Sequence, residues 1–339
     1  MTVPEQMTVS VLRGVHEVET EQRAVPVPAE GEVLIKVAAV GTCGSDVHYY
    51  EQGRIGDAVV REPLVLGHEA SGVVVACGPG ARKHVPGTRV AIEPGVPCGR
   101  CAECRLGRYN LCPDMVFFGT PPIDGAFAEY VTLHEAFAYP LPDSISDEAG
   151  ALLEPLSVGV WGARKARIGP GSRVLVTGAG PIGLIAAQTA RAFGASEVVV
   201  TDVNEHRLAV AGELGARTID VGRAELTGVE ADVLLECSGN PRATLQGIAA
   251  LGRAGRAVLI GMGADELALP VARVQQYELE VTGTFRYANT WPTAIELAAS
   301  GAVRLDRLVT HRFPLTEVRG ALTVAARDPA TIKPVVVPA

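Results

Sequence analysis

The sequence lacks several features that mark other classes of protein. It has no basic run, and its 30 Lys and Arg residues are outnumbered by 38 Asp and Glu residues, which gives a net charge of −8. This balance argues against nucleic acid or an anionic membrane as a partner. No apolar run reaches the ~18–20 residues of a membrane span. The start, Met1–Gln6, lacks the basic and apolar stretches of a signal peptide, so we expect a cytoplasmic protein.

The cysteines do not form a disulfide framework. There are seven, an odd number, and four of them cluster at metal-binding spacing: Cys98, Cys101, Cys104 and Cys112. Four thiolates at this spacing are typical of a closed structural zinc site, in a lobe of about residues 93–114. An iron–sulfur cluster is the alternative, because Pro113 follows Cys112 as in the bacterial ferredoxin run, although the last gap is longer here. A zinc ribbon for nucleic acid is disfavoured by the acidic chain.

The distribution of residue types along the chain predicts two domains of different kinds. The 339 residues suffice for two domains of ~100–200 residues each. The first half has short β-branched runs cut by Gly and Pro, such as 32–37, 71–75 and 88–92, which indicate an all-β unit. A helix is expected over 147–153. We predict that the last stretch, which includes Trp291–Glu296 and a tail with several prolines, returns to the first domain.

From Arg173 to about Gly283, apolar strands alternate with helical segments. Strands are expected at 173–177, 197–201, 232–237 and 257–261, and a helix is expected over 181–193. This alternation predicts a doubly wound parallel sheet.

A nucleotide-binding fingerprint lies inside this alternation. It runs Gly178-Ala179-Gly180-Pro181-Ile182-Gly183 between a strand and a helix. Gly178 is expected to make the tight turn, Gly180 to let the backbone approach a diphosphate, and Gly183 to pack helix on strand. The diphosphate is expected at the helix N-terminus, where free N–H groups favour negative charge.

Asp202 lies nineteen residues beyond Gly183, where a carboxylate accepts the adenosine ribose hydroxyls. It would repel a 2′-phosphate, so NAD is favoured over NADP. Two alternatives stay open: Asp202 caps the next helix, or Arg207 neutralises a phosphate and relaxes the preference.

Four metal-capable side chains are scattered over the first half: Cys43, His68, Glu69 and Glu154. One thiolate, one imidazole and one carboxylate leave a fourth position open on zinc, which is typical of a catalytic site. Cys43, His68 and Glu69 give a neutral site with Zn²⁺. A fourth ligand, Glu154, would make the site negative, so we expect Glu154 to act through the metal-bound water or alcohol.

Two further residues are candidates for proton transfer from a zinc-bound hydroxyl. Ser45 is placed to accept a hydrogen bond from the substrate hydroxyl, and His48 to pass the proton outward. Asp46, close to His48, is interpreted as a turn residue. A Lewis acid and a hydride carrier on one chain point to a dehydrogenase.

At these residues the chain resembles the zinc-dependent medium-chain dehydrogenases, and among them the sorbitol and xylitol dehydrogenases. The stretches that carry the resemblance are Cys43–Tyr50, Gly67–Gly72, Gly107–Cys112, Glu154–Gly159 and Phe285–Pro292, and the match covers almost the whole chain. The resemblance implies an α/β protein with a GroES-like β domain (1–146 and 286–339) and a Rossmann domain (147–285), with the active site in the cleft between them. It also implies a homotetramer with two zinc ions per chain, one catalytic and one structural.

The resemblance implies roles for further residues. Cys43, His68 and Glu69 would hold the catalytic zinc. The residues expected to line the polyol pocket are Tyr49, Phe118, Glu154, Arg286 and Tyr287. The further residues expected to contact NAD are Ile182, Asp202, Arg207, Ile260, Gly261, Met262, Thr284, Phe285 and Arg286. Arg286 is expected to donate hydrogen bonds to the polyol hydroxyls. Its alternative roles are a contact with a cofactor phosphate or a salt bridge between the domains.

The leading hypothesis is an NAD-dependent polyol dehydrogenase that makes a ketose. The alternatives are a dehydrogenase of threonine, butanediol or a sugar acid, and a zinc-free quinone reductase or non-catalytic nucleotide-binding protein of the same fold. A silent site would have no use for costly metal-binding groups, which speaks against the last two.

Overall fold

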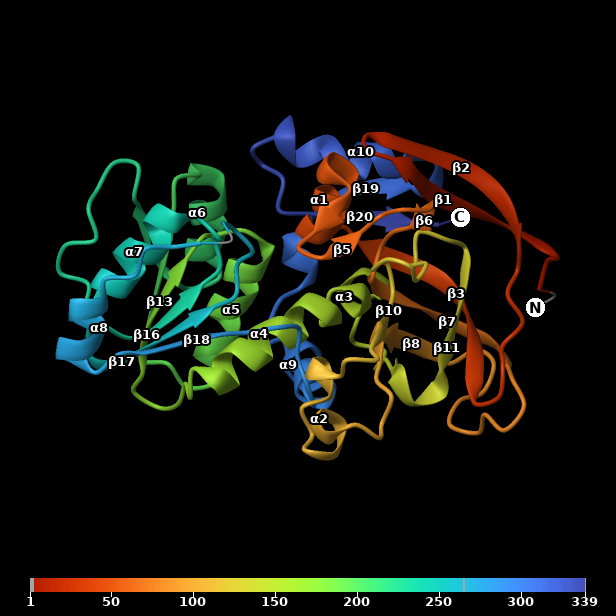
Figure 1. Cartoon of the computed structure of the whole chain (residues 1–339), viewed down its shortest axis with the longest axis horizontal. Coiled ribbons are helices and arrows are strands. Elements are labelled where there is room, and N and C mark those ends of the chain that lie inside the picture. Colours follow the sequence, from red (N-terminus) through yellow and green to blue (C-terminus); the bar gives the residue numbers. More distant parts are fainter. Residues whose placement is uncertain (1–2, 265, 339) are drawn as a thin grey trace. The chain divides into compact units, whose positions relative to one another are not determined.

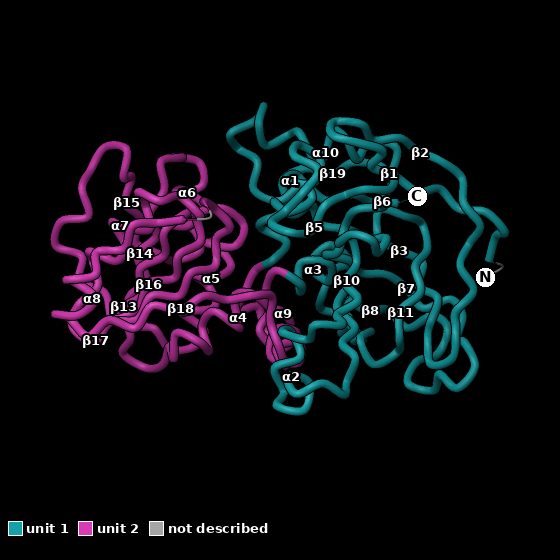
Figure 2. Tube along the Cα trace, viewed as in Figure 1, with its two compact units in different colours: residues 1–154, 305–339 teal, residues 155–304 magenta. Residues whose placement is uncertain are grey.

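The computed structural model describes residues 3–264 and 266–338. Residues 1, 2, 265 and 339, which the predicted domains include, lie outside the described residues. The chain divides into two compact units (Figure 2): unit 1 is residues 1–154 with 305–339, and unit 2 is residues 155–304. The sequence predicts domain boundaries after residues 146 and 285. In the structure the corresponding boundaries come later in the chain, after residues 154 and 304. Every helix among the described residues is too short or too polar to span a membrane.

Unit 1 consists mainly of β-strands, as its β-branched runs predict. Its largest sheet has the order β12-β8-β7-β3-β20-β19, with β11 also paired to β3, and a smaller sheet has the order β2-β1-β6 (Figure 1). The strands are β1 (Gln6–Gly14), β2 (Glu17–Ala24), β3 (Glu32–Gly41), β4 (Arg54–Ile55), β5 (Ala58–Val59), β6 (Leu64–Val65), β7 (Glu69–Cys77), β8 (Arg89–Ile92), β9 (Gly95–Val96), β10 (Val116–Phe117), β11 (Tyr130–His134), β12 (Ala138–Pro140), β19 (Val309–Pro314) and β20 (Lys333–Val337).

Short helices connect these strands. The α-helices of unit 1 are α1 (Gly44–Gln52), α2 (Ala102–Arg105), α3 (Asp147–Ala151) and α10 (Val318–Thr323), and the 3₁₀ helices are η1 (Tyr109–Leu111), η2 (Glu135–Phe137), η3 (Asp306–Leu308), η4 (Leu315–Glu317) and η5 (Val324–Ala326). The C-terminal segment returns to unit 1, where β20 pairs antiparallel with β3. The end of the chain therefore lies beside the strand that leads to Cys43.

Unit 2 contains one six-stranded sheet of order β15-β14-β13-β16-β17-β18, and all its neighbouring strands are parallel. This order confirms the predicted Rossmann-type sheet. The strands are β13 (Arg173–Thr177), β14 (Glu197–Asp202), β15 (Arg217–Asp220), β16 (Ala231–Glu236), β17 (Leu251–Leu259) and β18 (Glu280–Gly283). The helices are α4 (Leu153–Lys165, which begins at the unit boundary), α5 (Pro181–Ala192), α6 (Glu205–Glu213), α7 (Pro241–Ala249), α8 (Val271–Tyr277) and α9 (Trp291–Ala299). Figure 1 shows α5 to α8 around this sheet.

Two segments differ from the sequence-based expectation. The helix expected over 147–153 ends at Ala151, and α4 begins at Leu153. Pro155 explains the break, because it has no N–H to donate to the carbonyl of Ala151. The segment 286–304, expected in the first domain, belongs to unit 2. There the backbone N–H of Arg304 donates to the side chain of Gln188 on α5 at 2.8 Å.

Candidate functional site

Cys43, His68 and Glu69 come together in unit 1. One ligand atom from each lies within 4.8 Å of the other two. The cause is the pairing of β3 with β7, in which Gly41 stands opposite Glu69. Cys43 follows β3 as the N-cap of α1, and His68 immediately precedes β7. A side chain at Gly41 would come within 2.1 Å of Glu69 Oε2, so only glycine leaves room for the carboxylate.

Asp46 joins the two ligand segments, although the sequence suggests only a turn residue. Its carboxylate is fully buried and accepts hydrogen bonds from the backbone N–H of Cys43 at 2.9 Å and of Gly67 at 3.0 Å. Its Oδ1 lies 3.7 Å from Nδ1 of His68. Carboxylates in such positions orient metal ligands. Its place three residues after Cys43, where an acidic residue completes a capping box, is the signal that could have identified it.

Lys333 is the second residue that sequence reasoning missed. It is only 2% exposed, and its Nζ lies 2.8 Å from both carboxylate oxygens of Glu69 and 3.0 Å from the carbonyl oxygen of Thr42. It begins β20, which pairs with the end of β3. A lysine that opens the apolar run Pro334–Val337 is a weak sign of a buried partner.

The electrostatics of this cluster favour a cation. Burial disfavours the charged imidazolium of His68, yet the Asp46 carboxylate and Cys43 raise its pKa well above the ordinary range. Burial also opposes the charge on Lys333, but Glu69 and Cys43 raise its pKa. A thiolate, an imidazole and a carboxylate at this separation fit the donor set of zinc with an open position.

Two further charges adjoin the ligands and cancel: the Lys333 cation against Glu69 and the Asp46 carboxylate beside His68. With Zn²⁺, a Cys43 thiolate and a Glu69 carboxylate the site therefore stays neutral, and direct binding of Glu154 would make it negative. The carboxylate of Glu154 is also not among the three clustered ligand atoms. Glu154 is 5% exposed, and its charge raises the pKa of Lys333.

The other predicted residues of unit 1 lie on α1 and near β10. Ser45 and His48 are one turn apart on α1, and both are half-buried. Tyr49 (4% exposed) and Phe118 (9% exposed) belong to the hydrophobic core of the unit. Both rings therefore have fixed positions.

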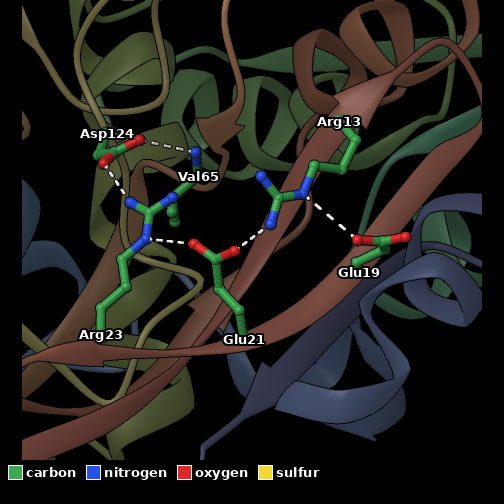
Figure 3. A network of polar contacts seen from close by, with 6 residues as sticks. All are labelled: Arg13, Glu19, Glu21, Arg23, Val65 and Asp124. Atoms are coloured by element: carbon green, nitrogen blue, oxygen red, sulfur yellow. Dashed lines mark hydrogen bonds and ion pairs between the residues drawn. The ribbon is translucent and has the colours of Figure 1, made fainter.

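A network of charged residues supports the segment before His68 (Figure 3). Asp124 accepts a hydrogen bond from the backbone N–H of Val65 at 2.8 Å and pairs with Arg23 on β2 at 2.8 Å. Glu21 joins Arg23 to Arg13, which also pairs with Glu19. Asp124 thus links the hairpin of β1 and β2 to Val65 on β6, the strand that leads to His68.

The cysteine quartet forms a second metal-capable cluster. The four sulfur atoms lie within 4.8 Å of one another. Zinc–sulfur bonds of ~2.3 Å in a tetrahedron require sulfur separations of about 3.8 Å, which lie inside this bound. The backbone N–H of Cys98 points to the sulfur of Cys112 at 3.3 Å, and that of Cys104 to the sulfur of Cys101 at 3.4 Å. Such amide contacts are typical of thiolate sites.

Glu93 connects this lobe to the β-sheet, and no sequence motif pointed to it. It is 1% exposed. Its two oxygens accept hydrogen bonds from the hydroxyl of Tyr109, between the third and fourth cysteines, at 2.8 Å and from that of Tyr139 on β12 at 3.0 Å. Burial raises the pKa of Glu93 to about 7, although both tyrosines act in the opposite direction.

The glycines of the predicted fingerprint have the geometry that a dinucleotide turn requires. Gly178 has φ +89°, which favours glycine. A side chain at Gly183 would come within 1.8 Å of the carbonyl oxygen of Gly178. Gly180 is the N-cap of α5, and Pro181 is its first residue. Free N–H groups at this helix N-terminus suit a diphosphate.

Asp202 ends β14 and contacts the glycine turn. Its Oδ2 accepts a hydrogen bond from the backbone N–H of Ala179 at 2.6 Å, and its Oδ1 accepts from Val203 and Asn204. The N-cap of α6 is Asn204, whose side chain accepts from the backbone N–H of Arg207. The alternative interpretation of Asp202 as a helix cap is therefore wrong.

Glu236 organises the neighbouring strand ends, a role the sequence did not suggest. This carboxylate is 2% exposed and accepts hydrogen bonds from the backbone N–H groups of Ser238 and Gly239, at 2.9 and 3.0 Å, and from the hydroxyl of Thr177. It fixes the turn after β16 beside the turn after β13.

The segments after β17 and β18 hold the remaining predicted cofactor contacts. A side chain at Gly261 would come within 2.4 Å of the backbone nitrogen of Gly239, and Met262 is 52% exposed. After β18, Thr284 donates a backbone hydrogen bond to the carbonyl of Leu259 at 3.0 Å. Arg286 comes two residues later, with φ +52°.

Comparisons with known proteins match both parts of the chain to families. Residues 29–143 match the alcohol dehydrogenase GroES-like domain family, and residues 181–300 match the zinc-binding dehydrogenase family. The chain is 43% identical over 332 residues to the sorbitol dehydrogenase of Bacillus subtilis (strain 168), which covers 95% of this chain and 94% of that protein.

Solved structures of oxidoreductases have the same fold as this chain. An oxidoreductase/dehydrogenase of unknown specificity from Escherichia coli has a TM-score of 0.94 at 36% identity and covers 98% of this chain and 99% of its own. A short chain alcohol dehydrogenase from E. coli CFT073, in complex with NADH, has a TM-score of 0.92 at 27% identity, with 98% and 100% covered.

The Lys333–Glu69 pair predicts a large stability effect. Lys333→Met should destabilise the metal-free protein by about 3–5 kcal/mol, because it leaves the buried carboxylate of Glu69 without a partner. Urea denaturation of the chelator-treated protein measures the effect. The double variant Lys333→Met/Glu69→Gln should recover more than half of the loss. Equal stability of the single and double variants would show that the pair is not the cause.

Glu93 predicts a pH dependence of stability. Its folded-state pKa of about 7 lies above the ordinary 4.5, so its stabilising contribution is complete below pH 4.5 and disappears as pH rises through about 7. Glu93→Gln keeps the neutral shape at every pH. The free energy of unfolding of the wild type minus that of the variant should therefore fall between pH 5 and 8. Parallel pH profiles for the two proteins would contradict the assignment.

Proposed function

This chain belongs to the sorbitol dehydrogenase family of zinc-binding dehydrogenases, and we propose that it oxidises a secondary hydroxyl of a polyol to a ketone with hydride transfer to NAD. The observation that carries the proposal is the clustering of Cys43, His68 and Glu69 in a chain that also has the dinucleotide turn. The resemblance drawn from the motifs is confirmed at the level of family and enzyme class.

Cys43, His68 and Glu69 would hold the catalytic zinc. Zinc bound there would act as a Lewis acid and lower the pKa of the substrate hydroxyl toward the neutral range. Asp46 and Lys333 hold the ligands in place, since they contact the backbone of Cys43 and the carboxylate of Glu69. Both contacts are inside the fold, so the ligands need little rearrangement on metal binding.

The proton would leave the substrate hydroxyl through α1. Ser45 would accept the hydrogen bond of that hydroxyl, and His48, one turn further along α1, would pass the proton to solvent. Glu154 would orient the water or the substrate alcohol beside these ligands. The cysteine quartet would hold a second, structural zinc ion, which gives two zinc ions per chain.

NAD would bind along the carboxyl edge of the parallel sheet in unit 2. The diphosphate lies at the N-terminus of α5, and Asp202 accepts the adenosine ribose hydroxyls. Further contacts come from Ile182, Arg207, the Ile260–Met262 turn and the Thr284–Arg286 segment. Asp202 already receives backbone N–H groups, and its remaining lone pairs stay available to hydroxyl donors.

The polyol would contact Tyr49, Phe118, Glu154, Arg286 and Tyr287. A site that donates hydrogen bonds to hydroxyls rejects substrates that lack them, because its polar groups are then left unpaired. We also propose a homotetramer and a reducing cytoplasmic location, which suits the seven free cysteines.

The polyol assignment is tested by substrate rates. The wild type should oxidise xylitol or sorbitol with NAD faster than threonine, 2,3-butanediol, a sugar acid or 2-propanol, and phenanthroline should abolish the activity. Arg286→Ala should lower kcat/KM for the polyol at least tenfold more than for 2-propanol, because only the polyol needs the donor. Equal losses on both alcohols would assign Arg286 to the cofactor or to the fold.

The cofactor preference is tested at Asp202. Asp202→Ala removes the carboxylate that repels a 2′-phosphate, so the ratio of kcat/KM for NAD to that for NADP should fall at least tenfold. Steady-state kinetics with both cofactors at a saturating polyol concentration give this ratio. Glu205→Ala, which removes the carboxylate at the start of the following helix α6, is the control and should leave the ratio unchanged.

A further inference from the structure

The backbone of the segment Thr284–Thr290 is left-handed at two residues, of which Asn289 is of a type that tolerates this conformation and Arg286 is not. Arg286 has φ +52° and Asn289 has φ +56°. A left-handed conformation costs an arginine roughly 1–2 kcal/mol. Such conformations persist only where neighbouring groups hold them. Arg286 and Tyr287 lie on this segment, so the contacts that hold its backbone also position these two side chains.

Hydrogen bonds of Thr284 hold the start of the segment, and the packing of Tyr287 holds its middle. The backbone N–H of Thr284 donates to the carbonyl of Leu259 on β17, and its hydroxyl contacts the same oxygen at 3.3 Å. The rings of Tyr287 and Trp291 pack edge to face, with centroids 6.1 Å apart, and both are almost fully buried. These contacts fix the rings but do not set the backbone at Asn289.

Arg164 holds the second end. It lies in the last turn of α4, and its Nη1 donates to the carbonyl oxygen of Asn289 at 2.6 Å, while its Nη2 donates to the hydroxyl of Thr293 on α9 at 2.9 Å. Among the described residues, Arg164 forms no ion pair with a carboxylate. The planar guanidinium thus binds the segment at Asn289 and the helix that follows it at Thr293. Lysine cannot reproduce this pair of bonds, because it lacks the forked geometry.

We propose that Arg164 is a positioning residue for polyol binding: it fixes the carbonyl of Asn289 and thereby the left-handed backbone that presents Arg286. This inference rests on the proposed role of Arg286 in the polyol pocket. The simpler explanation is that Arg164 only stabilises α4, because cations favour the C-terminal end of a helix. Lys165 is the natural control, since it shares that turn and has neither of the two bonds.

The experiment compares Arg164→Gln, Arg164→Lys, Thr293→Val and Lys165→Gln in the zinc-loaded enzyme. Arg164→Gln should raise KM for the best polyol about tenfold, with kcat and the kinetics of 2-propanol changed less than twofold. Arg164→Lys and Thr293→Val each keep part of the fork and should give intermediate values. Lys165→Gln should match the wild type. Because Arg164 is exposed, the variants should keep the wild-type melting temperature and zinc content.

NADH affinity, measured by fluorescence titration, separates positioning from a general disturbance of unit 2. The inference requires an unchanged Kd for NADH in Arg164→Gln. It is overturned if Arg286→Ala impairs polyol oxidation while Arg164→Gln does not, or if Arg164→Gln weakens NADH binding and 2-propanol oxidation as strongly as polyol oxidation. A wild type that prefers 2-propanol to every polyol would instead overturn the proposed function, and the role of Arg164 with it.

Discussion

The antiparallel pairing of β3 with β7, with the buried Lys333–Glu69 ion pair beside it, is the constraint on which the candidate metal centre depends. Gly41 stands opposite Glu69 in this pairing and leaves space for its carboxylate. β20 lies on the other side of β3 and delivers Lys333. Three segments far apart in the sequence thus meet at one place because a sheet joins them. The ligands start from strand ends, whose positions the ladder hydrogen bonds fix.

The dinucleotide half of the site depends on close backbone packing rather than on charge pairs. Gly178, Gly183, Gly239 and Gly261 each stand where a Cβ would meet a neighbouring segment at 3.0 Å or less. These contacts draw the turns after β13, β16 and β17 together at the carboxyl edge of the sheet. Glu236 stabilises the arrangement without a cation, since several hydrogen bonds satisfy its buried carboxylate.

Local pattern and motif spacing were enough to predict much of the fold and the metal-capable residues. The β-rich first half, the parallel sheet and the two metal-capable clusters could be anticipated, because Cys43, His68, Glu69 and the quartet have distinctive spacing. Lys333 and Glu93 could not, since their importance comes from partners 264 and 16 residues away that only the folded chain brings near. Pro155 contained the signal for the break between α3 and α4. The assignment of 286–304 to unit 2 depends on tertiary contacts that have no local signature.

The contrast between these regions suggests where substrate specificity resides. The metal ligands and the dinucleotide turn are fixed by ladder pairing and by glycines, so a substitution there damages the chemistry itself. Arg286 instead lies on a left-handed segment that a surface arginine and a buried aromatic pair hold. A few side chains can reposition such a segment without disturbing either sheet. In the proposed function, where Arg286 binds the polyol, specificity would therefore change independently of the metal and of the hydride acceptor.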